Sequence, residues 1–386
     1  MFLPLAFFQK GTVNLPIVDS AYPTDGIPNG FSIFAMAQAG NTVFVGGDFT
    51  TIGGIARNGI AAIDATTGAV ISWYPTGGVG GINPIVTSLL VNGTTLYVGG
   101  AFTTIGGIAR NGIAAVDIVS GSILSWYPTG GTGSNSTFVR CMCLKDNTLY
   151  IGGTFTSMGG LSRLRIAALD ITTASVSSWY PPGGAVGLVR VLTLSPDQTT
   201  IFVGGSHTTI GGQSRARISA LDATSGAVLN WGPGSFLSGS TSSPFVDILI
   251  VIGQKIFIGG TFDSIGGTTR NGLAALDYST GTLSSWYPPG GLTGNSLMAT
   301  GFGNIGNTLF VAGYFFTIGG VPRLSLAALD VTTGVTQNWY PPNGLGNTDS
   351  SVFKGFTLAG NSFWIFGIFQ SVGGLTRTNI AKLNLF

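Results

Sequence analysis

The sequence predicts an all-β fold, a seven-bladed β-propeller, from one repeated pattern, its period and the composition. With a few departures, seven copies read apolar-Gly-Gly-x-Phe-x-[Thr/Ser]-Ile-Gly-Gly-x-x-Arg, an Ala-rich stretch, Asp-x-x-[Thr/Ser]-Gly and Trp-Tyr-Pro. The first doublet ends at Gly47, Gly100, Gly153, Gly205, Gly260, Gly313 and Gly367, so the copies lie 52 to 55 residues apart. Such a period is typical of repeats that bury their faces against their neighbours.

The composition favours strands and turns. All fourteen acidic residues are Asp, 63 residues are Gly, and only 8% are charged, against roughly 25% in typical soluble domains. A net charge of +2 gives no general attraction to nucleic acid or membranes. No apolar run reaches a membrane span. The apolar stretch Phe2–Phe8 lacks a basic region before it and a small-residue cleavage site, so we expect no signal peptide.

Each copy divides into four strand-like runs. In the second copy they are Ile85–Val91, Thr95–Thr104, Asn111–Asp117 and Ser122–Tyr127, separated by the turns Asn92-Gly93, Gly106-Gly107 and Asp-Ile-Val-Ser-Gly. Four antiparallel strands per repeat of this length predict propeller blades.

The two ends of the chain are expected to complete one blade together. The last copy stops at Phe386 without a fourth strand, whereas Val18–Thr24 lines up with Val70–Thr76, with Ala21 in the place of Trp73. A strand from the N-terminal segment would then complete the seventh blade and cover its open sheet edge.

The predicted domain is therefore one propeller over residues 12–386, preceded by an apolar arm at residues 1–11. The blades are placed at residues 27–76, 77–129, 130–182, 183–233, 234–289, 290–342, and 343–386 plus 12–24.

Most repeated positions are explained by packing. A large apolar residue is expected once per innermost strand, at Met36, Leu89, Met142, Leu194, Leu249, Phe302 and Phe356. The single histidine, His207, stands where the other copies have Phe, so it is interpreted as a replaced core aromatic. The repeated Asp residues open hairpins in which a short carboxylate accepts backbone N–H bonds. With one histidine and one carboxylate per hairpin, we expect no catalytic residues, no metal site and no cofactor.

One arginine recurs three residues after each second Gly-Gly doublet. The set is Arg57, Arg110, Arg163, Arg215, Arg270, Arg323 and Arg377, and we expect it on the opposite face of the disk from the Asp turns. Arg140, Arg165, Arg190 and Arg217 fall near the same face. Two interpretations stay open: each arginine holds loop carbonyls or stacks on a ring and so locks neighbouring blades, or the ring recognises an anionic glycan, polymer or partner.

A tryptophan recurs on the outer strand, at Trp73, Trp126, Trp179, Trp231, Trp286 and Trp339. Packing between blades explains its spacing, and sugar stacking beside the Gly-rich loops is the alternative.

The repeats resemble several known propeller repeats. Gly-Gly after an apolar run, followed by aromatic residues, is similar to kelch, and Ala61–Trp73 is similar to the tryptophan-docking motif of quinoprotein propellers. The stretch Val45–Arg57 with the Ile-Ala-Ala strand after it resembles a propeller repeat of bacterial and phage surface proteins. A quinoprotein would imply eight blades and acidic calcium ligands, and copper-radical oxidases on kelch-like scaffolds would imply histidine ligands; this sequence departs from both.

The preferred functional hypothesis is a non-catalytic structural or recognition module on an extracellular or virion surface, for example a phage tail or capsid-associated protein or an adhesin. Its expected partners are other structural proteins or copies of itself, bound through Met1–Phe8. The alternative is a lectin that binds a surface glycan through Trp, Tyr and Arg at blade edges, and an enzyme is the third hypothesis. No nucleic-acid partner is expected.

Overall fold

The chain folds into many small antiparallel sheets in a β-propeller-like arrangement. The computed structural model describes residues 17–19, 22–23, 26–28, 31–134, 137–233, 237–238, 243–294, 297–341, 345–346, 352–359 and 362–384, and no helix occurs among them. None of the described segments is therefore a helix able to cross a membrane. The predicted arm, residues 1–11 with Met1–Phe8, and Ala21 lie outside the described residues.

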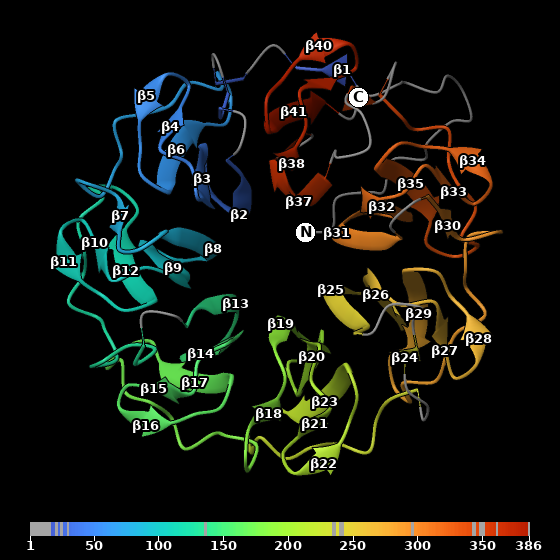
Figure 1. Cartoon of the computed structure of the whole chain (residues 1–386), viewed down its shortest axis with the longest axis horizontal. Coiled ribbons are helices and arrows are strands. Elements are labelled where there is room, and N and C mark those ends of the chain that lie inside the picture. Colours follow the sequence, from blue (N-terminus) through green and yellow to red (C-terminus); the bar gives the residue numbers. More distant parts are fainter. Residues whose placement is uncertain are drawn as a thin grey trace, which may run out of the picture.

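Three strands of each repeat pair in one sheet, and Figure 1 shows these sheets around a common centre. The first strands lie innermost: β2 (Ile33–Ala39), β8 (Ile85–Asn92), β13 (Val139–Lys145), β19 (Val189–Leu194), β25 (Phe245–Ile252), β31 (Met298–Ile305) and β37 (Val352–Ala359). The middle strands are β3 (Thr42–Gly47), β9 (Thr95–Ala101), β14 (Thr148–Gly153), β20 (Thr200–Gly205), β26 (Lys255–Thr261), β32 (Thr308–Tyr314) and β38 (Ser362–Ile368). The third strands are β6 (Ile60–Asp64), β12 (Ile113–Asp117), β17 (Ile166–Asp170), β23 (Ile218–Asp222), β29 (Leu273–Asp277), β35 (Leu326–Asp330) and β41 (Ile380–Asn384).

Short hairpins lie outside the three-stranded sheets, around the second Gly-Gly doublet of each repeat. They pair β4 (Thr51–Ile52) with β5 (Ile55–Ala56), β10 (Thr104–Ile105) with β11 (Ile108–Ala109), β15 (Ser157–Met158) with β16 (Leu161–Ser162), β21 (Thr209–Ile210) with β22 (Gln213–Ser214), β27 (Ser264–Ile265) with β28 (Thr268–Thr269), β33 (Thr317–Ile318) with β34 (Val321–Pro322), and β39 (Ser371–Val372) with β40 (Leu375–Thr376). Five of them gain a strand from the connection that precedes the sheet: β7 (Val79–Gly80), β18 (Ala185–Val186), β24 (Leu237–Ser238), β30 (Leu292–Thr293) and β36 (Leu345–Gly346).

The fourth run of each repeat is much shorter than the sequence predicts. In the second repeat the expected strand Ser122–Tyr127 is reduced to one bridge between Ile123 and Val116. Hydrogen bonds join Asp117 N to Ser122 O and Leu124 N to Ala115 O. Beyond them Trp126 turns towards the following sheet and Pro128 has no N–H to donate. The pairing therefore ends after its first residues.

The N-terminal segment pairs with the last repeat. Strand β1 (Ile17–Val18) lies antiparallel to β41, with Val18 opposite Leu383, and it completes the four-stranded sheet β1-β41-β38-β37. Lys382 Nζ lies 3.1 Å from Asp19 Oδ2 in the same sheet. Residues from both ends of the chain therefore build this sheet.

The last sheet also differs in its core. Trp364 and Lys382 stand opposite each other where the first repeat pairs Phe44 with Ala62. The Trp364 ring is fully buried and packs with residues of the first repeat, such as Val45. The last sheet therefore places a larger ring at this core position than the first repeat does.

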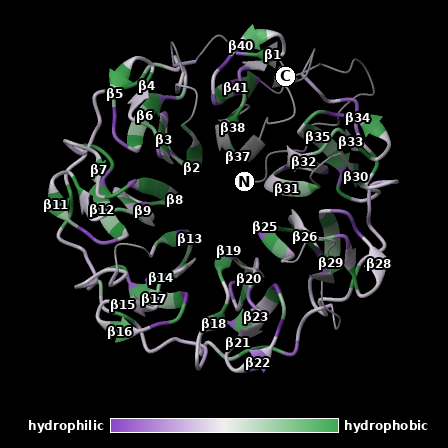
Figure 2. Cartoon of the chain, in the orientation of Figure 1, coloured by the Kyte–Doolittle hydropathy of each residue, from purple (hydrophilic) through white to green (hydrophobic). Residues whose placement is uncertain are grey.

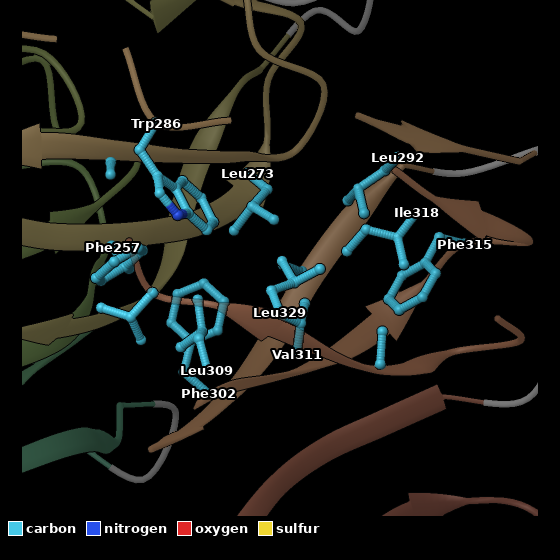
Figure 3. Packing of buried hydrophobic residues seen from close by; sticks show 14 residues of the cluster. Phe257, Leu273, Trp286, Leu292, Phe302, Leu309, Val311, Phe315, Ile318 and Leu329 are labelled. Carbon is cyan, nitrogen blue, oxygen red and sulfur yellow. The ribbon is translucent and has the colours of Figure 1, made fainter. Parts of the chain in front are cut away.

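The core lies between consecutive sheets. In the cluster of Figure 3, Phe257, Leu273 and Trp286 of the fifth repeat pack against residues of the sixth, including Leu309 and Leu329. Figure 2 shows apolar residues on strands all round the ring and not on one side of it. Each sheet is thus buried mainly by its neighbours, as the period predicts.

The two Gly doublets serve different purposes. A Cβ on Gly99, in the first doublet of its repeat, would lie 2.8 Å from Val139 Cγ1, so the close approach of the following sheet requires glycine. In the second doublet Gly106 and Gly107 have φ of 56° and 74°, in the left-handed region that glycine adopts without strain.

One expected core position is wrong in the fourth repeat. Opposite Val203, the place that Met36 takes opposite Val45, the structure has Leu192 and not Leu194. The turn after this innermost strand is longer, with Ser195, Asp197 and Gln198 joined by hydrogen bonds. Because of the longer turn, the large apolar position lies two residues earlier in the chain than the sequence predicts.

Candidate functional site

The recurring arginines bond to backbone carbonyls of their own repeats. Arg57 donates from Nη1 to Ala56 O at 3.0 Å and from Nη2 to Ile71 O at 3.2 Å. Its guanidinium carbon lies 4.6 Å from the centre of the Tyr74 ring, and the Tyr74 hydroxyl accepts a hydrogen bond from Asn58 N. The arginine therefore ties the loop before the third strand to the outer segment of the same repeat.

The same contacts recur around the ring, with informative differences. Carbonyl pairs are bound by Arg57, Arg110, Arg163, Arg215, Arg270, Arg323 and Arg377. In the fourth repeat Gly232 replaces the tyrosine, so it offers Arg215 no ring. In the last repeat Arg377 binds Asp19 O at 2.9 Å and stacks on Tyr22 at 4.7 Å, which joins the two ends of the chain.

These contacts support the loop-holding interpretation of the arginines, within one repeat and not between two. The Nε atom of each is buried without a hydrogen-bond partner. Recognition of an anion by this ring stays a prediction.

The recurring tryptophans are packed between repeats. Trp286 is 3% exposed, lies 4.7 Å from Phe257 in an edge-to-face contact and donates from Nε1 to Asp330 O of the next repeat at 3.1 Å. Trp73, Trp126, Trp179 and Trp231 make the corresponding bond to the following repeat, whereas Nε1 of Trp339 is buried without a partner. This supports packing for Trp73, Trp126, Trp179, Trp231 and Trp286, because a buried indole has no free face for a sugar; the Trp339 ring is only partly buried.

The recurring Asp residues hold the hairpin turns. Asp277 Oδ1 accepts hydrogen bonds from Ser279 and Thr280, which together with their backbone N–H groups lower the pKa of Asp277 to about 2. Asp64 ends β6 whereas Arg57 precedes it, so the carboxylates and arginines lie at opposite ends of the third strands. No group of three or more His, Cys, Asp or Glu side chains suited to a metal occurs in the part of the chain that the structure describes.

A cavity of about 360 Å³ lies between the innermost strands. Its wall includes Arg140 of β13, Arg190 of β19 and Asp247 of β25. Asp247 Oδ1 accepts from Arg140 Nη2 at 3.1 Å and from Arg190 Nη1 at 2.9 Å. The Arg190 guanidinium carbon also lies 3.8 Å from the centre of the Phe245 ring. This ion cluster joins three repeats beside the cavity.

The cluster arises from a β-bulge that sequence reasoning missed. In β13 the pairing shifts between Val139 and Cys141, which leaves Arg140 outside the regular ladder. The residues at this bulge position are Phe34, Thr87, Arg140, Arg190, Asp247, Thr300 and Lys354, and the first six line the cavity. The sequence does mark this position by its variation: it holds a chemically different residue in most repeats, whereas the positions around it are similar in all of them.

Burial and neighbouring charges shift the pKa values of groups at and near the cavity. Burial lowers the pKa of Arg190, Asp247 opposes that shift, and the charge of Arg140 adds to it. Burial, and then the charge of Asp247, raise the pKa of Tyr314. Burial also raises the pKa of Cys141, which lines the cavity as a free thiol, to about 12, so this thiol is neutral.

Comparison with known proteins supports the fold alone. No family model and no curated protein matches the sequence. The structure is similar to the crystal structure of a computationally designed protein, Ika8, with 15% identity, a TM-score of 0.55 and coverage of 94% of this chain and 98% of that one. It is also similar to a chain in the crystal structure of a mitotic checkpoint complex, with 14% identity, a TM-score of 0.59 and coverage of 99% and 98%.

Proposed function

We propose that the chain is a closed, seven-bladed propeller that acts as a non-catalytic structural or recognition module on an extracellular or virion surface. Closure is supported by the β1–β41 pairing, by the bond from Arg377 to Asp19 O, and by the contact between the innermost strands β2 and β37. Closing the ring would leave no repeat with an uncovered face.

The observation that carries the functional proposal is the use of the repeated polar and aromatic side chains. Arg57 holds carbonyls of its own repeat, Asp64 holds its own hairpin, and Trp73 bonds to the carbonyl of Asp117 in the next repeat. Side chains that make these contacts rigidify a scaffold and are not free for chemistry. A rigid disk suits a protein that presents loops or assembles with other structural proteins or with copies of itself.

The surface location is tested by immunogold labelling of the full-length protein in its native source. We expect label on particles or on the cell exterior, and the same fractionation should recover the chain with other structural proteins. Label confined to the cell interior, with the chain recovered as a free monomer, would contradict the proposal. The fold is tested separately by electron microscopy, in which seven-fold averages of the disk are expected.

A further inference from the structure

The cavity wall carries a positive charge that the protein neutralises only in part. Arg140 and Arg190 contribute two positive charges and Asp247 one negative charge, so the ion cluster keeps a net charge of +1 (2 − 1). These side chains are only 30%, 21% and 14% exposed, respectively. A partly desolvated charge of this kind interacts strongly with an added anion, because water screens it less than it screens a surface charge.

The donors of the cluster are not all used. Both guanidinium groups bond to the same oxygen, Asp247 Oδ1, although an arginine offers five N–H donors. Nε of Arg190 is buried and has no hydrogen-bond partner, and the Phe245 ring holds the guanidinium in place. Planar guanidinium groups are suited to paired bonds with carboxylate or phosphate oxygens.

We propose that the cavity binds a small oxyanion group, a carboxylate or a phosphate, between Arg140 and Arg190. A volume of about 360 Å³ lies at the low end for ligand pockets, so it suits a small ion or the terminal group of a longer ligand. Thr87 and Thr300 also line the wall, but their hydroxyls donate to Val139 O and Ala312 O, so the arginines are the donors that the site offers.

Asp247 would compete with an anionic ligand for the two arginines. Its single bonded oxygen bridges the two arginines as an anion's oxygen would, so a ligand must compete with this carboxylate for the same donors. Replacing Asp247 by Asn removes the competing charge and keeps the shape of the side chain. The proposal therefore predicts that Asp247→Asn binds oxyanions more tightly than the wild-type chain.

The experiment is calorimetric titration of the full chain with inorganic phosphate at low ionic strength, with chloride as the control ion. We expect Asp247→Asn to tighten phosphate binding about tenfold, and Arg140→Gln and Arg190→Gln to weaken it about tenfold or more. Lys145→Gln is the matched control, because it removes one positive charge from the other end of β13. Its phosphate affinity should equal that of the wild type.

If an arginine variant fails to fold, the Asp247→Asn variant still tests whether the cavity binds an oxyanion. Phosphate binding that is undetectable at millimolar concentration in both wild type and Asp247→Asn, or that Asp247→Asn fails to tighten, would overturn the proposal. So would equal weakening in Lys145→Gln and Arg190→Gln. In that outcome the cluster only joins three repeats.

A second arm distinguishes a free ion from the end of a peptide. A short peptide with a free C-terminal carboxylate is compared with its C-terminal amide, each titrated against the wild-type chain. Binding of the free acid alone, displaced by phosphate, identifies a chain terminus as the source; phosphate binding without peptide binding identifies a free anion. Either result is independent of where the protein resides. The proposed surface location is therefore tested separately, by the immunogold labelling.

Discussion

His207 Nε2 lies 3.1 Å from Ser219 Oγ, and both side chains are fully buried. The pair replaces a Phe and an Ala that stand twelve residues apart in the other six repeats. Those pairs are Phe49/Ala61, Phe102/Ala114, Phe155/Ala167, Phe262/Ala274, Phe315/Ala327 and Phe369/Ala381. The two departures from the repeat therefore belong together, because the serine gives the buried histidine a hydrogen-bond partner.

The His207–Ser219 pair should make stability depend on pH. Burial and the nearby charge of Arg217 lower the pKa of His207 to about 4, from about 6.5. The unfolded chain thus binds a proton that the folded chain excludes, and the free energy of unfolding should fall as the pH drops from about 6.5 towards 4. The full shift corresponds to about 3 kcal/mol. Urea unfolding at pH 7.5 and pH 5 should show the fall in wild type.

The matched variant is His207→Phe with Ser219→Ala, which restores the residues of the other repeats. It should be more stable than wild type. Its free energy of unfolding should also fall less between pH 7.5 and pH 5, because it lacks His207. Ser219→Ala alone leaves His207 without its partner and should cost about 1 to 2 kcal/mol. Equal pH dependence in wild type and the double variant would contradict this account.

The arginine contacts predict unequal losses in different repeats. Arg270 binds two carbonyls and lies 4.6 Å from the centre of the Tyr287 ring, whereas the repeat of Arg215 has Gly232 in the place of that tyrosine. Arg270→Ala should lower the free energy of unfolding by about 2 to 3 kcal/mol, and Arg215→Ala by about 1 kcal/mol less. Urea unfolding of both variants measures the difference, and identical losses would show that the ring contributes nothing.

The tryptophans offer a similar comparison. Trp286→Phe removes the hydrogen bond to Asp330 O and should cost about 1 kcal/mol beyond the lost ring volume. Trp339→Phe removes an N–H that is buried without a partner, so its loss should be smaller by about that amount. Thermal unfolding under one set of conditions compares the two variants, and a larger loss for Trp339→Phe would contradict the proposed role of the bond.

The repeat made most of the fold predictable because each packing position occurs several times. Phe49 and Trp73, for example, are identified as core residues by their recurrence, and both are buried. Strand lengths were less predictable, because the sequence gives no warning that the Ser122–Tyr127 run leaves the sheet after one bridge.

The cavity could not be located from the sequence, because its charged residues are set by a bulge. Alternation along a regular strand would assign Arg140 by its place relative to Cys141, whereas the bulge shifts the register between Val139 and Cys141. The Arg190–Asp247 contact joins residues 57 positions apart, and only the arrangement of the repeats brings them together. Recurrence in the sequence therefore identifies the scaffold but does not locate the cavity.

The joint between the two ends of the chain predicts a large effect from one ion pair. Lys382 and Asp19 are only 11% and 16% exposed, so Lys382→Ala would leave the Asp19 carboxylate in a poorly solvated site. We expect this variant to lose about 3 kcal/mol. Lys382→Met with Asp19→Asn removes both charges at similar volume and should lose less, because it leaves no carboxylate charge in the poorly solvated site. Urea unfolding measures both losses, and limited proteolysis should cut first near β1 in Lys382→Ala. A greater loss in the double variant would show that the pairing of β1 with β41 depends on the ion pair itself and not on avoiding an unpaired charge.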